Sequence, residues 1–123
     1  MFKQQLKVWV KRRLFILRFN FDLSDGVLTN VKAEDRGIGK TTYLVKQCKK
    51  YNLGLIVGSQ HEKKRIIEDF KFKHVYTMTE VKRYPHTNIH EFLVDETVNY
   101  KFLHDYYLNT HPKIKVIGGV RVS

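Results

Sequence analysis

The sequence predicts an α/β domain in which helices flank a mostly parallel sheet of about four to five strands. Short apolar runs alternate along the chain with segments whose apolar residues recur at helical spacing. An apolar content of 42% argues against wholesale disorder. The 123 residues suit one domain. We therefore expect a single domain over 1–123, with a basic N-terminal helix or extension in 1–24 and a core in 27–120.

The first segment, from Phe2 to Phe21, is both apolar and basic. Its spacing predicts a helix over most of its length and an extended stretch near Asn20, where a period of two appears. The helical spacing defines an apolar stripe, which comprises Leu6, Val10, Leu14 and Leu17. Such a basic helix lies on a membrane surface or, more often, packs its stripe on its own domain or on a partner.

The remaining elements alternate between strands and helices. The predicted strands span 27–33, 53–58, 75–78, 90–96 and 113–120. The predicted helices begin near Lys40, His61 and Thr97, and a brief helical turn begins at Thr79. Right-handed crossovers between parallel strands would bring Lys40 and Asp95 together at the carboxyl ends of two strands, where open α/β sheets bind ligands.

The loop after the first core strand carries the most specific motif. It reads Arg36-Gly37-Ile38-Gly39-Lys40-Thr41-Thr42. In a phosphate-binding loop, backbone N–H groups converge on phosphate oxygens, the Lys reaches the β- and γ-phosphates, and the Thr hydroxyl takes a Mg²⁺ position. The helix that begins there adds its positive end. Glu34 replaces the first glycine of the full G-x-x-x-x-G-K-[ST] pattern.

An acidic pair, Asp95-Glu96, ends the predicted strand over 90–96. An Asp at such a strand end holds Mg²⁺, and an adjacent Glu polarises the attacking water. The alternative is an ordinary strand followed by an acidic helix N-terminus, where the helix dipole favours carboxylates. The order of the loop and the acidic pair along the chain favours a nucleotide site.

The formal net charge of +11 raises the expectation of a polyanionic partner. The candidate nucleic-acid-binding residues are Lys11, Arg12, Arg13, Lys63, Lys64 and Arg65. The alternative is that the positive charges belong to solvated helix faces or reflect a Lys-rich composition, without a polyanionic partner. The single cysteine, Cys48, fits a reducing cytoplasm and should face the sheet. No signal-peptide pattern or membrane-spanning run is found, so we expect a cytoplasmic protein.

With these motifs in order, the chain resembles P-loop NTPases of the helicase and terminase type, and small phage-encoded ATPases in particular. The resemblance covers Val27 to Val120. It implies that ATP or another nucleoside triphosphate binds at residues 36–42 with Mg²⁺. It also implies that Lys40 binds phosphate, that Thr41 and Asp95 serve Mg²⁺, and that Glu96 is the catalytic base. In this family an extra strand separates the loop strand from the Asp-Glu strand, and Ile114 to Ile117 would follow as the sensor strand.

The function expected from this resemblance is an ATPase in viral or phage DNA metabolism or packaging, in the host cytoplasm. Such an ATPase would assemble as a homo-oligomer or as part of a larger viral complex. Gly118-Gly119 stands where the family has a polar sensor residue. The alternative is therefore a degenerate P-loop module that binds nucleic acid or a protein partner through its basic surface. A nucleotide kinase is a third reading, but Arg83 is the lone candidate for the Arg-rich lid that such enzymes need.

Overall fold

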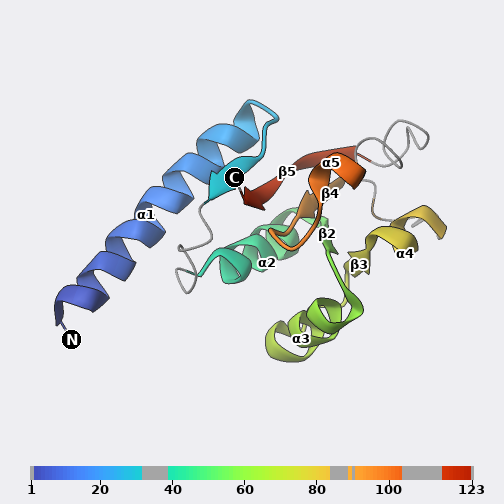
Figure 1. Cartoon of the computed structure of the whole chain (residues 1–123), viewed down its shortest axis with the longest axis horizontal. Coiled ribbons are helices and arrows are strands. Elements are labelled where there is room, and N and C mark those ends of the chain that lie inside the picture. The colour runs from blue at the N-terminus through green and yellow to red at the C-terminus, as the bar shows by residue number, and fades with distance from the viewer. Residues whose placement is uncertain (1, 32–38, 84–88, 90, 104–114, 123) are drawn as a thin grey trace.

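The computed structural model describes residues 2–31, 39–83, 89, 91–103 and 115–122. In this part of the chain five parallel strands form one sheet, which confirms the predicted α/β class (Figure 1). The strands are β1 (Thr29–Val31), β2 (Gly54–Val57), β3 (Val75–Thr77), β4 (Glu91–Val94) and β5 (Lys115–Val122). Their order across the sheet is β1-β5-β4-β2-β3.

Helices cover both faces of the sheet. They are α1 (Phe2–Ser24), α2 (Lys40–Tyr51), α3 (Gln60–Phe70), α4 (Met78–Arg83) and α5 (Tyr100–Leu103). Successive residues of β2 alternate between the faces. Leu55 and Val57 join the core beneath α1, α2 and α3, whereas Ile56 joins the core beneath α4 and α5. Cys48 is fully buried in the first of these cores, as expected.

The last strand of the sequence lies in the middle of the sheet. β5 pairs with β1 through Thr29 and Val120, and with β4 through Val94 and Gly119. Helix α1 lies against both β5 and β1. A Cβ atom at Gly118 would lie 2.6 Å from Cδ1 of Leu23, so the missing side chain lets α1 approach β5 closely. β5 therefore separates β1 from β4.

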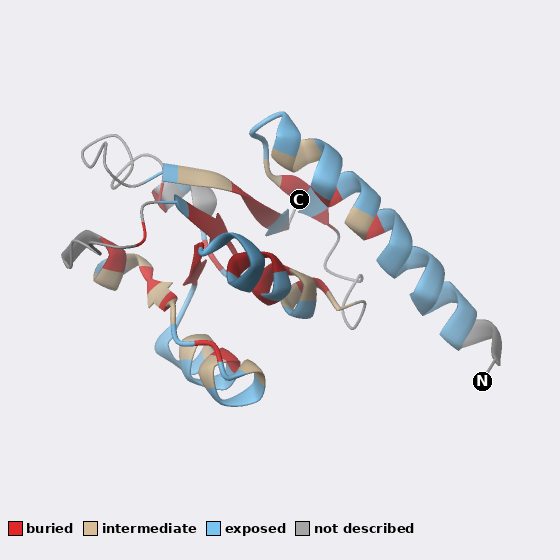
Figure 2. Ribbon diagram, turned by 180° about the vertical axis from the view of Figure 1, so that it is seen from behind, coloured by how far each residue is buried: buried red, intermediate tan, exposed pale blue. Residues whose placement is uncertain are grey.

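The extended stretch expected near Asn20 is wrong, because α1 continues as one helix to Ser24. A strand would turn Leu17 and Phe21 to the same side as Phe15, Phe19 and Leu23, whereas a helix separates the two sets. Phe15 and Phe19 are buried with Leu23 packed against them, and Leu17 and Phe21 are exposed. Residues 5–14 of α1 extend past this core and are exposed around the circumference of the helix (Figure 2). The predicted stripe of Leu6, Val10, Leu14 and Leu17 does not pack on its own domain.

Other boundaries differ by a few residues. β1 omits Val27 and Leu28, and α5 begins at Tyr100 instead of Thr97. Met78 begins α4 instead of ending β3, because Thr77 and Glu80 form a capping box. Glu80 N–H donates to Oγ1 of Thr77 at 3.4 Å, and Thr77 N–H donates to Oε1 of Glu80 at 3.1 Å.

Some predicted segments lie outside the described residues, namely 32–33, 90, 104–108 and 113–114. Within the described ranges, no helix is both long enough and apolar enough to cross a bilayer.

Candidate functional site

Helix α2 begins at Lys40 with an uncommon N-terminus. Gly39, at the N-cap position, has φ 85° and ψ 25°, in the left-handed region that favours glycine, and its cap has no side-chain hydrogen bond. The N-terminal N–H groups and the positive end of the dipole make such a terminus suitable for an anion. Thr41 is half-buried and Thr42 is exposed. The other motif residues, Arg36, Gly37 and Ile38, lie outside the described residues, as does Glu34.

Lys40 is buried although it carries a charge, with only 5% of the residue exposed. Its Nζ atom lies 3.8 Å from Oε2 of Glu96, whose side chain is 25% exposed. The fold thus brings the first residue of α2 to the acidic pair after β4, as the sequence predicts. A buried ammonium needs compensating partners, and the Glu96 carboxylate supplies a negative charge to it.

Asp95 is 2% exposed and its carboxylate is held by Thr97. Oδ2 of Asp95 accepts hydrogen bonds from Oγ1 of Thr97 at 2.8 Å and from its N–H at 3.3 Å. The same hydroxyl oxygen accepts the Gly58 N–H at 2.9 Å. Thr97 therefore links the ends of β2 and β4. Sequence analysis did not identify this role, although an Asp that accepts a hydrogen bond from the N–H two residues on is a recognisable turn pattern.

Gly58 is the second residue that sequence analysis missed. A Cβ atom at this position would lie 2.2 Å from the carbonyl oxygen of Thr97. Only glycine therefore allows the backbone after β2 to approach the turn after β4 this closely.

The electrostatic environment of Asp95 opposes its ionisation. Burial raises the pKa of the carboxyl group, and the nearby carboxylate of Glu62 on α3 adds to this effect. Hydrogen bonds from Thr97 and from the Glu96 backbone act in the opposite direction, because they stabilise the carboxylate. A buried carboxylate of this kind gains from a cation, so Asp95 suits the role of magnesium ligand that the sequence predicts.

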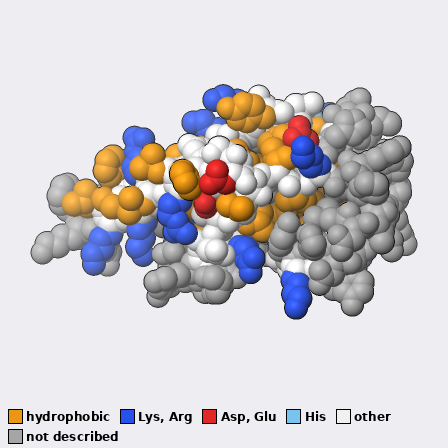
Figure 3. Space-filling view, turned by 90° about the horizontal axis from the view of Figure 1, so that it is seen from above, with side chains coloured by type: hydrophobic (Ala, Val, Ile, Leu, Met, Phe, Trp, Pro, Cys, Tyr) orange, Lys and Arg blue, Asp and Glu red, His pale blue; other side chains and the backbone are white. Residues whose placement is uncertain are grey.

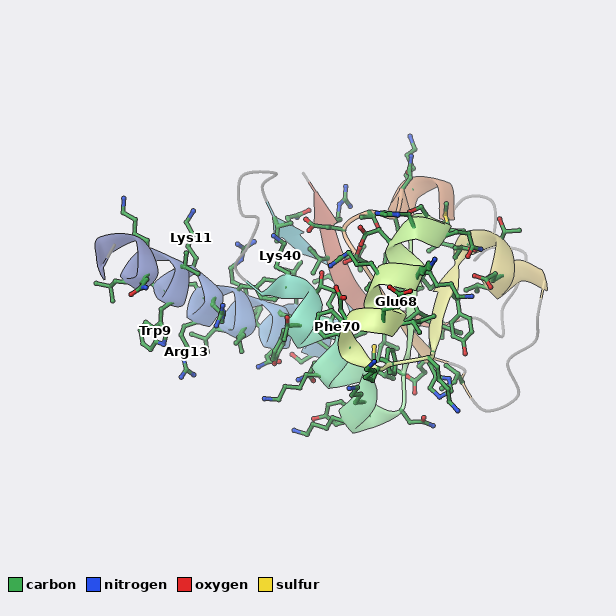
Figure 4. All side chains as sticks on the ribbon, turned by 90° about the horizontal axis from the view of Figure 1, so that it is seen from below. Trp9, Lys11, Arg13, Lys40, Glu68 and Phe70 are labelled. Atoms are coloured by element: carbon green, nitrogen blue, oxygen red, sulfur yellow. The ribbon has the colours of Figure 1, made fainter. Side chains whose placement is uncertain are left out.

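Arg12 of α1 reaches the N-terminus of α2, which the sequence did not predict. A Cβ atom at Gly39 would lie 3.2 Å from Nε of Arg12 and 3.6 Å from its Cζ. Arg12 also borders a shallow, open depression of about 360 Å³ on the surface of α1, together with Gln5, Val8 and Trp9. Figure 4 shows Lys11 on one side of α1, and Trp9 and Arg13 on the other.

The predicted nucleic-acid-binding residues divide into two groups. On α3, Lys63 forms an ion pair with Glu80, and Arg65 forms ion pairs with Glu62 and Asp69, so carboxylates of the same domain offset these charges. Lys64 is exposed. On α1, the three predicted residues are exposed, and they are Lys11, Arg12 and Arg13.

β5 contributes no polar side chain where it passes Asp95. Gly119 has φ 143°, and a Cβ atom there would lie 2.4 Å from the carbonyl oxygen of Val94. A side chain is therefore excluded at the position where the family resemblance implies a polar sensor residue.

Two other kinds of chemistry receive no support from the described residues. They contain no cluster of three or more His, Cys, Asp and Glu side chains that could hold a metal ion without further ligands from a bound molecule. Burial raises the pKa of the Cys48 thiol to about 12, so this group stays protonated and unreactive at neutral pH.

Comparison of the chain with known protein families, with curated proteins and with solved structures gave no match.

Proposed function

We propose that this chain is a P-loop NTPase that binds Mg²⁺ and a nucleoside triphosphate, such as ATP, between the N-terminus of α2 and the acidic pair after β4. The observation that carries the proposal is the ion pair between Lys40 and Glu96 at the carboxyl end of a parallel sheet. Ligands bind in open α/β sheets at this edge. The position of β5 between β1 and β4 also supports the resemblance.

The phosphate groups would bind at the start of α2. The N–H groups of its first turn, which no side chain of Gly39 caps, are donors for phosphate oxygens. Lys40 would exchange its contact with Glu96 for a contact with phosphate. A phosphate anion satisfies the buried ammonium as the carboxylate does, so this exchange keeps the charge compensated.

The same exchange would prepare Glu96 for catalysis. Once Lys40 binds phosphate, the Glu96 carboxylate is available to orient a water molecule and accept its proton. Thr41 and Asp95 are the residues that would hold Mg²⁺, which neutralises charge on the phosphate oxygens. Thr97 would keep the Asp95 carboxylate in position.

Arg12 would add a second cation to the phosphate site. Its guanidinium group already lies against Gly39, and Arg binds phosphate through paired N–H groups.

The direct experiment is a calorimetric titration of the purified chain with ATP, with and without Mg²⁺, followed by an assay of phosphate release. The proposal requires saturable binding that strengthens with Mg²⁺. If neither ATP nor GTP binds with Mg²⁺ present, the chain is not a nucleotide-binding protein.

A degenerate P-loop module is the second candidate, and Gly119 is the observation that favours it. With glycine at position 119, β5 has no side chain beside Val94 that could sense or orient the γ-phosphate. Such a module would bind a nucleic acid, DNA or RNA, independently of nucleotide. Because ion pairs on α3 offset the charges of Lys63 and Arg65, nucleic acid would contact mainly Lys64 and the basic residues of α1.

An anisotropy titration with single- and double-stranded DNA at several salt concentrations tests the second candidate. Each phosphate contact should contribute a slope of about −0.7 to −0.9 to the dependence of log affinity on log salt. DNA binding that is unchanged by Mg²⁺·ATP, together with no phosphate release, would favour the module over the NTPase.

A further inference from the structure

Helix α1 carries a second apolar surface on the side away from the sheet. We call it the outer stripe, and it comprises Leu6, Val10, Leu14, Leu17 and Phe21. Each of the five side chains is exposed, up to 66% at Leu17 and 68% at Phe21. At 3.6 residues per turn they span about 80° of the circumference and about 22 Å of length, roughly opposite the buried Phe15 and Phe19. The stripe is therefore straight and narrow.

Basic side chains border the outer stripe on both sides. Helical spacing puts Lys7 and Arg18 at one edge and Arg13 at the other. Arg13 lies 5.4 Å from the centroid of the Trp9 ring, and Nη2 of Arg18 donates to the Asn30 carbonyl at 2.6 Å. These partners carry no negative charge, so the edges stay cationic. Figure 3 shows hydrophobic side chains in a row along α1, with Lys and Arg on either side.

The surface that covers this stripe has to bury apolar groups and supply negative charge along both edges. A second copy of the chain would bring the same cations, and like charges repel. Nucleic-acid phosphates would match the cations but leave the stripe in water. An anionic bilayer offers acyl chains beneath a layer of negative head groups, which matches the stripe and its edges together.

We propose that α1 docks its outer stripe on the surface of an anionic lipid bilayer and lies in the interface without crossing it. A straight stripe meets a flat surface along its whole length. Lys and Arg side chains at the edges can keep their charges among the head groups while their methylene stems cover apolar surface. This surface goes beyond the proposed nucleotide site and does not depend on it, because Arg12 contacts Gly39 from another side of the helix.

The experiment is co-sedimentation of the full chain with vesicles of phosphatidylcholine, with and without about one-third phosphatidylglycerol. The test variant is Leu14→Gln/Leu17→Gln. The matched control is Val8→Gln, which replaces an exposed aliphatic residue of the same helix by the same amide, away from the outer stripe. Circular dichroism checks that each variant is folded, and the fluorescence of Trp9, the single tryptophan, reports the environment of α1.

We expect the wild-type chain and Val8→Gln to sediment with anionic vesicles and much less with neutral ones. The test variant should partition at least about tenfold more weakly, because two leucine side chains no longer leave water. Equal sedimentation of the test variant and the control would overturn the role of the stripe, and equal binding to neutral vesicles would overturn the role of the cations. If the chain stays in solution with anionic vesicles at low salt, the surface does not bind a bilayer.

Discussion

Nζ of Lys40 lies 3.8 Å from Oε2 of Glu96, so the first residue of α2 and the acidic pair after β4 form an ion pair across the edge of the sheet. In the proposed site these two residues have different partners, namely a phosphate group for Lys40 and a water molecule for Glu96. In the proposed site, nucleotide binding would therefore separate the two side chains. Nucleotide binding and the release of Glu96 would be one event.

Replacement of Lys40 by Ala should weaken nucleotide binding. The change removes a charge-assisted contact to phosphate, which contributes on the order of 1.5–3 kcal/mol. Isothermal titration calorimetry with Mg²⁺·ATP measures the loss. Lys46→Ala is the matched control, because Lys46 is an exposed lysine of the same helix. Equal affinities for Lys40→Ala and the wild type would show that the phosphate site is assigned to the wrong residues.

Replacement of Glu96 by Gln should lower turnover far more than affinity. A general base acts mainly in the transition state. Its loss should therefore lower kcat and leave the affinity for the bound substrate nearly unchanged. Nucleotide affinity can even rise, because Lys40 no longer has to leave a carboxylate. Phosphate release under saturating ATP is the measurement, and Glu91→Gln on the exposed start of β4 is the control. Full turnover in Glu96→Gln would remove Glu96 from catalysis.

Arg12→Ala should also reduce nucleotide affinity, by about 1.5–3 kcal/mol if the guanidinium group binds phosphate directly. Arg13→Ala is the control, since its side chain lies over the Trp9 ring. Both variants lose one positive charge from the same helix, so a general electrostatic effect would lower both affinities equally. Calorimetry at 0.1 M and 0.5 M salt separates the two cases. Equal losses in both variants would contradict a specific contact at Gly39.

Asp95→Asn should change how the free energy of unfolding depends on pH. Burial raises the pKa of Asp95 in the folded protein, so the folded state holds its proton to higher pH than the unfolded state does. The stability from this group is present below the unfolded pKa of about 3.9 and is lost as pH rises through the folded pKa. The Asn variant lacks this loss and keeps an oxygen that can accept from Thr97.

Urea unfolding of the wild type and of Asp95→Asn at several pH values measures this effect, because other titrating groups cancel in the difference. The free energy of unfolding of Asp95→Asn, relative to the wild type, should increase as pH rises above about 4. A difference that stays constant with pH would mean that Asp95 ionises as easily in the folded chain as in the unfolded chain.

Gly58→Ala should destabilise the protein by about 1–3 kcal/mol or more, because the new methyl group would push the backbone at position 58 away from the backbone of Thr97. Its Cβ would lie 2.2 Å from the Thr97 carbonyl oxygen, and the Gly58 N–H bond to Thr97 would be strained as well. Gly26→Ala is the control, since nothing lies within 4 Å of its Cβ position. Gly26 has φ 72°. The loss of stability in Gly26→Ala therefore measures the effect of a left-handed backbone alone, without a steric clash. Thermal unfolding should show the larger loss at Gly58.

The sequence alone predicts the alternation of strands and helices, because apolar residues of β2, β4 and α3 follow local periods that depend only on the chain. It also predicts that Lys40 and the Asp95-Glu96 pair share one edge, because parallel strands have their carboxyl ends together. The end of α1 was not predictable in this way. Phe15, Phe19 and Leu23 share one side in a helix and in a strand alike, and only the exposure of Phe21 beside the burial of Phe15 and Phe19 selects the helix.

Tertiary structure alone decided the contacts between residues that no local pattern relates. Arg12 lies at Gly39 because α1 packs beside α2, and Thr97 joins Gly58 to Asp95 because β2 and β4 are paired in the sheet. It also decided which apolar residues of α1 are buried. Leu14 and Phe15 are neighbours of similar hydrophobicity, but a helix turns them to different sides. Phe15 contacts the core, whereas Leu14 remains at the surface, since the sheet can cover only one side of the helix.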